Sequence, residues 1–147
     1  MADHLHKQIR GAIVTALTGL TTSGSRVYAN RLAPLPDTTS PSLLITLDDE
    51  RAEGLTVHRP QAQDRTLALS VAAVAKASTT LDATLDLMSK EVEVALSAGI
   101  TISGRLLDVF YTGMSFEDQQ LDKPVGIKRM SFSIPFTAMS NAPDTLI

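Results

Sequence analysis

The sequence predicts an α+β fold, in which a mainly antiparallel β-sheet carries two helices packed on one face. Three observations predict it: two stretches in which apolar residues recur at helical spacing, alternating apolar and polar runs elsewhere, and an order in which helices and strands do not alternate regularly. A helix with one apolar stripe must bury it, and the face of a sheet is the partner available here. With 147 residues the chain fits one domain, expected over residues 1–147.

The first predicted helix covers residues 1–20. Asp3 is the expected N-cap, and Gly19 with the polar residues after it is expected to end the helix. A short strand over residues 26–28 follows, and then a proline-rich stretch, residues 30–42, with little periodicity, which predicts an extended arm or an ordered loop. The first predicted helix, residues 1–20, has a single apolar stripe made of Leu5, Ile9, Ala12, Ile13, Ala16, Leu17 and Leu20.

A meander of antiparallel strands is expected over residues 43–75. Residues 43–49 and 65–73 alternate well between apolar and polar side chains, and residues 55–59 alternate weakly. The segment ERAEG is expected to be the turn between the first two strands. The segment HRPQAQDR is expected to be the loop between the last two.

The second predicted helix covers residues 79–98, with Gly99 as the left-handed residue at its C-terminal end. Further strands are expected within residues 105–138, joined by a long polar connection over residues 112–126. Pro135 predicts either an edge strand or a strand whose outer backbone is not paired within the chain. The apolar face of the helix comprises Leu81, Leu85, Met88, Val92, Ala95 and Leu96.

Composition argues against several functions. The chain has no cysteine, so disulfides and thiolate metal sites are ruled out. Its net charge is −3, and no run of Lys or Arg provides a footprint for duplex DNA. Four Phe, two Tyr and no Trp are few for a base-stacking platform. No stretch approaches the roughly 18 continuous apolar residues of a membrane span, and the N-terminus does not resemble a secretory signal.

Three consecutive acids, Asp48, Asp49 and Glu50, end the first long strand. On a regular strand Asp48 and Glu50 share one face and Asp49 points to the other. The acids have three interpretations: a catalytic metal site, protection of a strand end from unwanted pairing, or a subunit contact. A metal site would usually recruit a further Asp, Glu or His, and the spacing selects none of the candidates Asp64, Asp108, Glu117 and Asp118.

Other catalytic signatures are missing from the sequence. It has no G-x-S-x-G elbow, no P-loop, no G-x-G-x-x-G and no H-E-x-x-H. Enzyme function therefore has no positive support, and we assign no catalytic, cofactor-binding or metal-binding residues. Long polar segments, residues 21–42, 50–64 and 112–126, instead carry isolated apolar residues that either lie in subunit contacts or fold back onto the core. These residues are Leu32, Leu35, Met114, Phe116 and Leu121.

Several phrases, together with the order of elements over nearly the whole chain, resemble one protein family. RVYANRLAPLP before the first long strand, LLITLDDE at its end, and KPV before the last strand resemble the tail terminator proteins of long-tailed bacteriophages, the minor tail protein U-like or tail-completion proteins. The resemblance implies a structural virion protein that forms a hexameric ring on the head-proximal end of the tail tube. Such a ring ends tube polymerisation and presents the head–tail joining surface. Six copies of a 15.7 kDa chain weigh about 94 kDa.

The resemblance also implies partners and a location. The partners are further copies of the chain, the tail tube protein and a head completion or neck protein, and no cofactor or membrane is involved. Genomic DNA passes through the ring without sequence-specific binding, and the protein is assembled in the host cytoplasm into the virion. The acids are expected either to meet arginines of a neighbouring subunit or to line the channel and repel DNA. The candidate interface residues are Arg26, Arg31, Asp48, Asp49, Glu50, Arg51, Met114 and Phe116.

Two alternatives to the terminator interpretation stay open. A head–tail connector or neck protein of the same virion has a similar size, and fold alone does not separate the two. A metal-dependent hydrolase that uses Asp48, Asp49 and Glu50 is the remote alternative.

Overall fold

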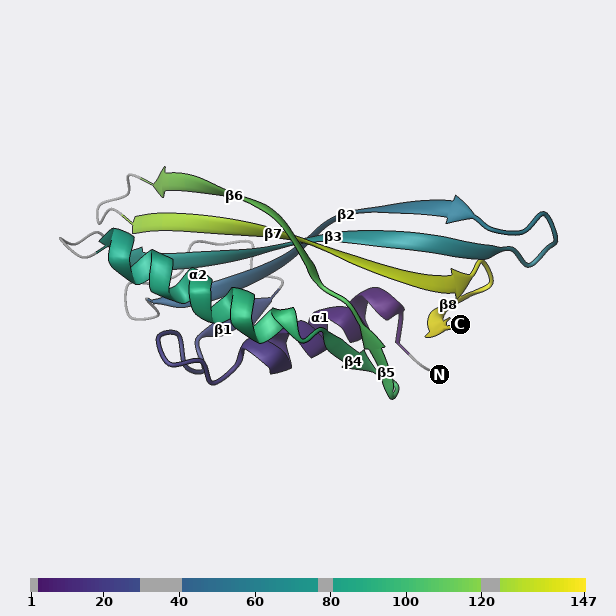
Figure 1. The fold of residues 1–147 in the computed structure, drawn as a ribbon, viewed down its shortest axis with the longest axis horizontal. Helices are drawn as coiled ribbons and strands as arrows, with labels where there is room; N and C mark the ends of the chain where they lie inside the picture. Colours follow the sequence, from purple (N-terminus) through teal and green to yellow (C-terminus); the bar gives the residue numbers. More distant parts are fainter. Residues whose placement is uncertain (1–2, 30–40, 77–80, 120–124) are drawn as a thin grey trace.

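The computed structural model describes residues 3–29, 41–76, 81–119 and 125–147. It confirms the predicted α+β fold class. Figure 1 shows a long twisted sheet with both helices beneath it. In chain order the elements are α1 (Leu5–Leu17), β1 (Val27–Ala29), β2 (Ser42–Gly54), β3 (Ala62–Lys76), α2 (Leu81–Ser97), β4 (Ile100–Ile102), β5 (Arg105–Leu107), β6 (Phe110–Gln119), β7 (Val125–Met139) and β8 (Ala142–Leu146).

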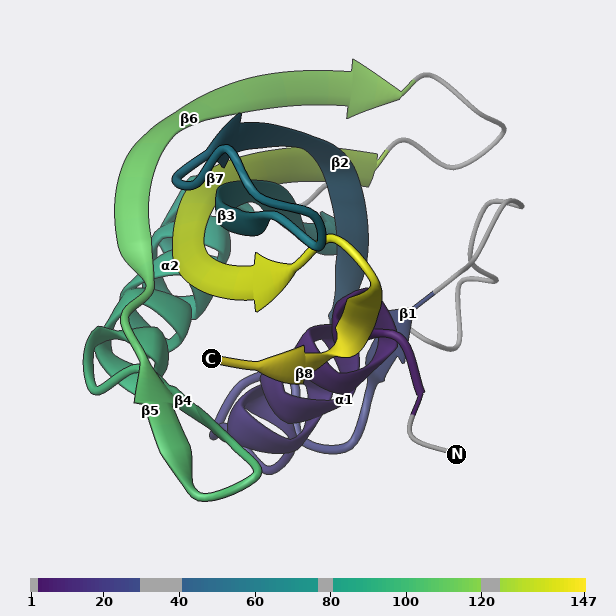
Figure 2. The same cartoon turned by 90° about the vertical axis from the view of Figure 1, so that its right-hand side faces the viewer.

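The main sheet has the strand order β1-β2-β3-β7-β6, and β8 pairs with β7 beyond the point where β6 ends its pairing. All of these neighbours are antiparallel except β1 and β2, which are parallel. Viewed along the long axis, the sheet curls strongly and both helices lie on the same side of it (Figure 2). Strands of this length accumulate right-handed twist, which explains the curl.

The core lies between the helices and the sheet. On α1 the predicted stripe is confirmed at Leu5, Ile9, Ile13 and Leu17, all 0% exposed. Alternate residues of β3 from Leu67 to Ala75 face the helices, as the period of two in a strand requires. A smaller buried cluster on the opposite face contains Ala72, Val74 and Ile127. The α2 contribution to the main core is Leu85, Met88, Val92 and Leu96.

The predicted three-strand meander over residues 43–75 is wrong. Strand β2 continues through the expected turn ERAEG to Gly54, so residues 42–76 form one two-stranded hairpin, and the weakly alternating residues 55–59 lie in its loop. The outer part of this hairpin, residues 51–64, projects beyond the helices and is called the arm (Figure 1). Residues 51–60 are exposed throughout, so the sequence there shows no apolar alternation. Backbone hydrogen bonds alone pair this part of β2 with β3.

Two other elements, α1 and β6, also differ from the predictions. Helix α1 begins at Leu5 with His4 as its N-cap, in place of Asp3, while the predicted start of α2 at residue 79 lies outside the described residues. Strand β6 occupies much of the connection expected over residues 112–126. Pro135 lies between the last β7 residue paired with β6 and the first paired with β8. Within the described residues, β7 has no strand partner there on that side, as one of the two predictions for Pro135 states.

Candidate subunit-contact surfaces

A β-bulge divides the acidic cluster of β2. Leu47 pairs with Leu69, and the next pair joins Asp49 to Ala68, which leaves Asp48 as the extra residue. Asp48 accepts a hydrogen bond from the Ser70 hydroxyl on the sheet face away from the helices. The prediction that Asp48 and Glu50 share a face is therefore wrong, because one inserted residue reverses the alternation.

Glu50 points toward the helices and is held within its own chain. Its Oε1 lies 2.9 Å from His6 Nε2, and its Oε2 lies 4.0 Å from Nη1 of Arg65. Arg65 is 9% exposed, and its Nη2 donates to Gln63 Oε1 at 2.9 Å. Its Nε has no hydrogen-bond partner among the described residues. Glu50 is thus an anchor between α1 and the base of the arm.

The first turn of α1 brings two histidines together beside this anchor. The His6 backbone N–H donates to His4 Nδ1 at 3.0 Å, and the ring centroids are 4.2 Å apart. Burial lowers the pKa of His4 below its ordinary value, and the nearby His6 and Arg65 lower it further. His4 therefore favours the neutral form, which is also the form that can accept the capping hydrogen bond.

The arginines proposed as interface residues lie in different settings. Arg26 Nε donates to the Pro41 carbonyl at 2.6 Å, and its Nη2 donates to the Thr22 carbonyl at 3.0 Å. Arg51 is exposed on the arm and makes no ion pair within the part of the chain that the structure describes. Arg31 lies outside the described residues, as do Leu32, Leu35 and Leu121. The roles of Arg26, Arg31 and Arg51 in an interface stay predictions.

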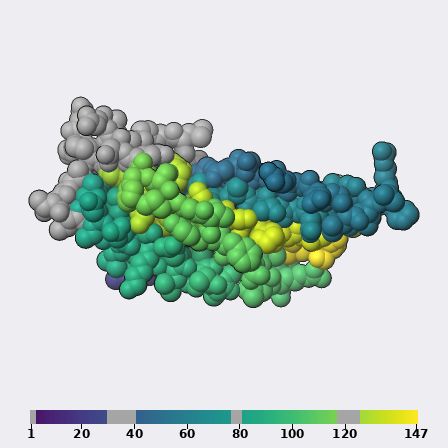
Figure 3. All heavy atoms as spheres, turned by 45° about the horizontal axis from the view of Figure 1, so that its top comes forward, coloured from purple at the N-terminus to yellow at the C-terminus, as the bar shows by residue number. Residues whose placement is uncertain are grey.

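Met114 and Phe116 are exposed, by 41% and 57%, and do not fold back onto the core. Strand β6, which carries them, is an edge of the sheet with no described strand on its outer side. Figure 3 shows β6 in green beside α2 in teal on one side of the molecule, and we call this surface the β6–α2 face. The large apolar side chains that are exposed on β6, on α2 and on the neighbouring strand β5 are Leu87, Val94, Leu106, Phe110, Tyr111, Met114 and Phe116.

The sequence analysis missed the α2 and β5 members of this face. Leu87 is 49% exposed and Val94 is 64% exposed. They are seven residues apart, so they share the side of α2 turned away from the core stripe. Two apolar residues at that spacing on an otherwise polar helix face could have predicted an exposed apolar surface on α2. Leu106 is 65% exposed on a three-residue strand too short to show a pattern.

A cavity of 270 Å³ lies within the β6–α2 face, between the end of α2 and the start of β6. Leu96 and Phe132 line it and are buried, while Glu93 and Asp108 bring carboxylates to it. Ser89 donates to Glu93 Oε2 at 3.2 Å. The cavity therefore combines an apolar lining with negative charge. Its other lining residues are Ser97, Val109, Phe110 and Tyr111.

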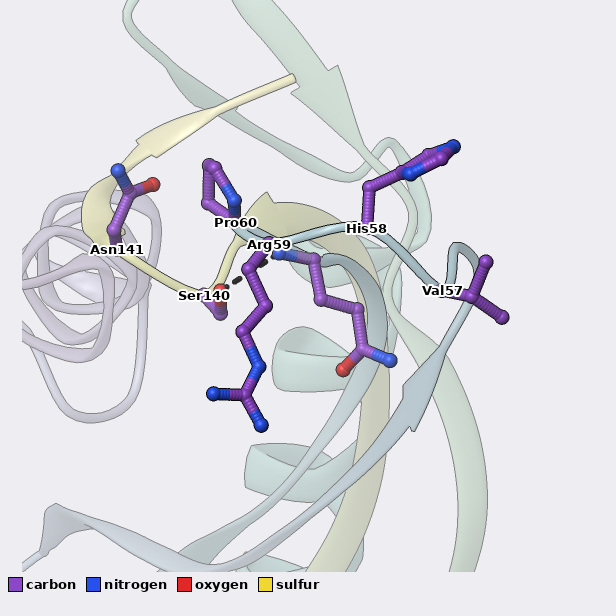
Figure 4. A pocket seen from close by; sticks show the side chains of 7 residues that line it. Val57, His58, Arg59, Pro60, Ser140 and Asn141 are labelled. Atoms are coloured by element: carbon purple, nitrogen blue, oxygen red, sulfur yellow. Dashed lines mark hydrogen bonds between the residues drawn. The ribbon is translucent and has the colours of Figure 1, made fainter.

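A second, larger hollow of 780 Å³ lies at the tip of the arm, where the loop meets the β7–β8 turn (Figure 4). Val57 is 95% exposed and points away from the other residues drawn there. The hydrogen bond from the Gln61 backbone N–H to Ser140 Oγ, 2.9 Å long, closes one side of the hollow. The lining residues are Val57, His58, Arg59, Pro60, Gln61, Ser140 and Asn141.

Within the described ranges, no group of three or more His, Asp or Glu residues is placed to hold a metal ion. The bulge at Asp48 removes the shared face on which the metal interpretation of the acidic cluster depended. No helix in the described part of the chain has both the length and the apolar character needed to cross a membrane. The described residues also present two surfaces: an edge strand, β6, with exposed apolar side chains, and a projecting arm.

The fold defines the chain as an α+β protein with one long, curled, mainly antiparallel sheet. No protein-family model matches the chain, and no curated protein matches it. Among solved structures, it is similar to a chain of the virion of a native gene transfer agent (GTA) particle, with 17% sequence identity and a TM-score of 0.45. The similarity covers 90% of this chain and 91% of that one. At this identity and TM-score, the likeness carries no argument about function.

Proposed function

We propose that the chain is a structural protein of a phage-like virion, and specifically a tail terminator. In this proposal six copies form a ring at the head-proximal end of the tail tube, end its polymerisation and provide the surface that joins head to tail. The observation that carries the proposal is the set of large apolar side chains left exposed on β6, α2 and β5, beside a strand edge with no described partner. Apolar side chains exposed beside an unpaired strand edge are costly for a free monomer and typical of an assembly contact.

The shape of the sheet supports a ring over a two-fold dimer. Strand β6 leaves one edge open, and on the other edge β1 pairs only with residues 43–45 of β2. The rest of β2 has no described strand partner on that side. A subunit with two different open sides can form head-to-tail contacts, and these close into a ring when the rotation between subunits allows it. The sequence resemblance to tail terminators selects this particular ring.

The acids on the outer face of β2 are accessible among the proposed interface charges. Asp48 and Asp49 are both exposed, whereas Glu50 is engaged by His6 and Arg65. Replacing both exposed acids, Asp48→Lys with Asp49→Lys, is expected to lower ring formation and leave the monomer folded. Molar mass and a thermal melt measure the two effects. A ring of unchanged mass would remove both residues from the interface.

The function itself is tested on the particle that encodes the chain. Loss of the gene is expected to give tails of uncontrolled length that do not join heads. Purified protein added to isolated tail tubes is expected to bind one end of each tube, seen by electron microscopy with a labelled chain. Binding to the portal or neck complex in place of the tube end would support the connector alternative. A protein absent from purified virions would overturn both functions.

A further inference from the structure

Exposed large apolar side chains in the described residues fall into two main groups, apart from the terminal Ile147. One group is the β6–α2 face, and the other is the arm tip, with Leu55 54% and Val57 95% exposed. We propose that the arm tip of one copy docks into the cavity of the β6–α2 face of a second copy. The inference rests on the proposed function and deepens it, because this docking would be the head-to-tail contact of the ring.

The arm tip is built to present a fixed shape. The Leu55 N–H donates to the Ala62 carbonyl at 2.8 Å, and Gln61 Nε2 donates to the Thr56 carbonyl at 2.9 Å. The Ser140 N–H donates to the Gln61 carbonyl at 2.7 Å, which ties the loop to the β7–β8 turn. A loop already held in place loses little conformational entropy on binding. Val57 is 95% exposed, so any molecule that binds the arm tip can contact this side chain.

The receiving cavity suits a side chain of the same character. Buried Leu96 and Phe132 line it, and Tyr111 packs edge-on against Phe132 with ring centroids 5.7 Å apart. Burying an apolar side chain such as valine there removes apolar surface of both copies from water. Phe110, which also lines the cavity, is 53% exposed and adds apolar surface at its edge.

The charges of the two surfaces are complementary. Arg59 is the only Asp, Glu, Lys or Arg among residues 55–61 at the arm tip, and it makes no ion pair within the described ranges. The cavity has the carboxylates of Glu93 and Asp108, and no basic side chain lines it. Opposite charges at the rim of an apolar contact fix its register and disfavour the reversed arrangement, in which like surfaces would meet.

A chain cannot fill its own cavity. In Figure 1 the arm tip projects past both helices, whereas the cavity lies at the junction of α2 and β6. With the arm of another copy as the occupant, the contact is heterologous, since each copy both donates an arm and accepts one. Contacts of this type build a closed ring or an open filament, in contrast to the two-fold contact of a dimer.

The test alters the arm tip and the cavity in separate variants. Val57→Asp removes the apolar side chain at the arm tip, and Asp108→Arg reverses a charge at the cavity. Both positions are exposed, so both variants should fold. Each variant alone is expected to have the mass of one 15.7 kDa chain by light scattering. An equimolar mixture should give a species of twice that mass and nothing larger, because one intact arm meets one intact cavity. Thr15→Asp, on the exposed side of α1, should assemble like the unaltered chain.

Cysteine cross-linking gives a second readout, since the chain has no cysteine of its own. Val57→Cys mixed with Ser97→Cys is expected to form a disulfide between two chains, whereas Thr15→Cys with Ser97→Cys is not. Three outcomes would each overturn the inference. The single variants could assemble like the unaltered chain, the mixture could give no dimer, or the unaltered chain could stay monomeric up to its solubility limit. The tube-end binding test does not depend on which surfaces the copies use, so the proposed function stands or falls separately.

Discussion

Replacing Gly99 with alanine is expected to destabilise the protein strongly, and the structure supplies a matched control. Gly99 follows α2 with φ +80°, and its N–H donates to the Leu96 carbonyl at 3.0 Å. A Cβ there would lie 2.5 Å from the backbone oxygen of Leu107 in β5. Gly104 has almost the same dihedral angle, φ +79°, but an added Cβ meets nothing within 4 Å.

The two substitutions share one cost and differ in another. Placing alanine in the left-handed region costs about 1–2 kcal/mol at either position. At Gly99 the backbone of the β4–β5 hairpin must also move, and overpacking of this kind costs about 1–3 kcal/mol more. The free energy of unfolding should therefore fall by about 2–5 kcal/mol for Gly99→Ala, against about 1–2 kcal/mol for Gly104→Ala.

Urea unfolding followed by circular dichroism measures both values, with the m-value unchanged if only the folded state is affected. For a chain of this size each kcal/mol lowers Tm by about 2–4 °C, so thermal melts give an independent check. Equal losses for the two variants, or a larger loss for Gly104→Ala, would show that the end of α2 does not approach β5 as described.

Three further predictions concern stability. Glu50→Ala should lower the free energy of unfolding by about 1–3 kcal/mol in urea titrations, because the buried Arg65 loses its carboxylate; an unchanged midpoint would mean that the anchor contributes nothing. Since the pKa of His4 is lowered in the folded chain, the unfolded chain binds the proton more readily, and stability should fall as pH drops below the ordinary value of 6.5. His4→Asn, which keeps a capping oxygen, should weaken that pH dependence, and identical pH profiles would refute the assignment. Met130 and Met114 are paired across β7 and β6 but are 0% and 41% exposed. In urea titrations the free energy of unfolding should fall by about 2–5 kcal/mol for Met130→Ala and by less than about 1 kcal/mol for Met114→Ala. Similar losses for the two variants would contradict the burial described.

The helices could be predicted from the sequence because their apolar stripes record burial on one face. Leu5, Ile9 and Ile13 at helical spacing are fully buried, and Gly99 is in the left-handed conformation expected after a helix. The arm could not be predicted in the same way. Its strands project into solvent, so neither side selects apolar residues, and the pattern of side chains does not record the pairing.

The contact surfaces were only partly predictable. Met114 and Phe116 stood out as apolar residues in a polar stretch, and both are exposed; their place in a subunit interface stays a prediction. The geometry of the acidic cluster was not accessible, because the bulge at Asp48 adds a single residue that the local alternation does not reveal. Arg26 shows a similar limit, since its backbone acceptors depend on how distant loops meet.

The molar mass of the purified chain in solution, measured by light scattering on a sizing column, tests the central claim most directly. The account predicts a species of six 15.7 kDa chains, about 94 kDa, that disassembles when the arm tip or the cavity is altered. A mass of 15.7 kDa at every concentration, unchanged when tail tubes are added, would contradict it.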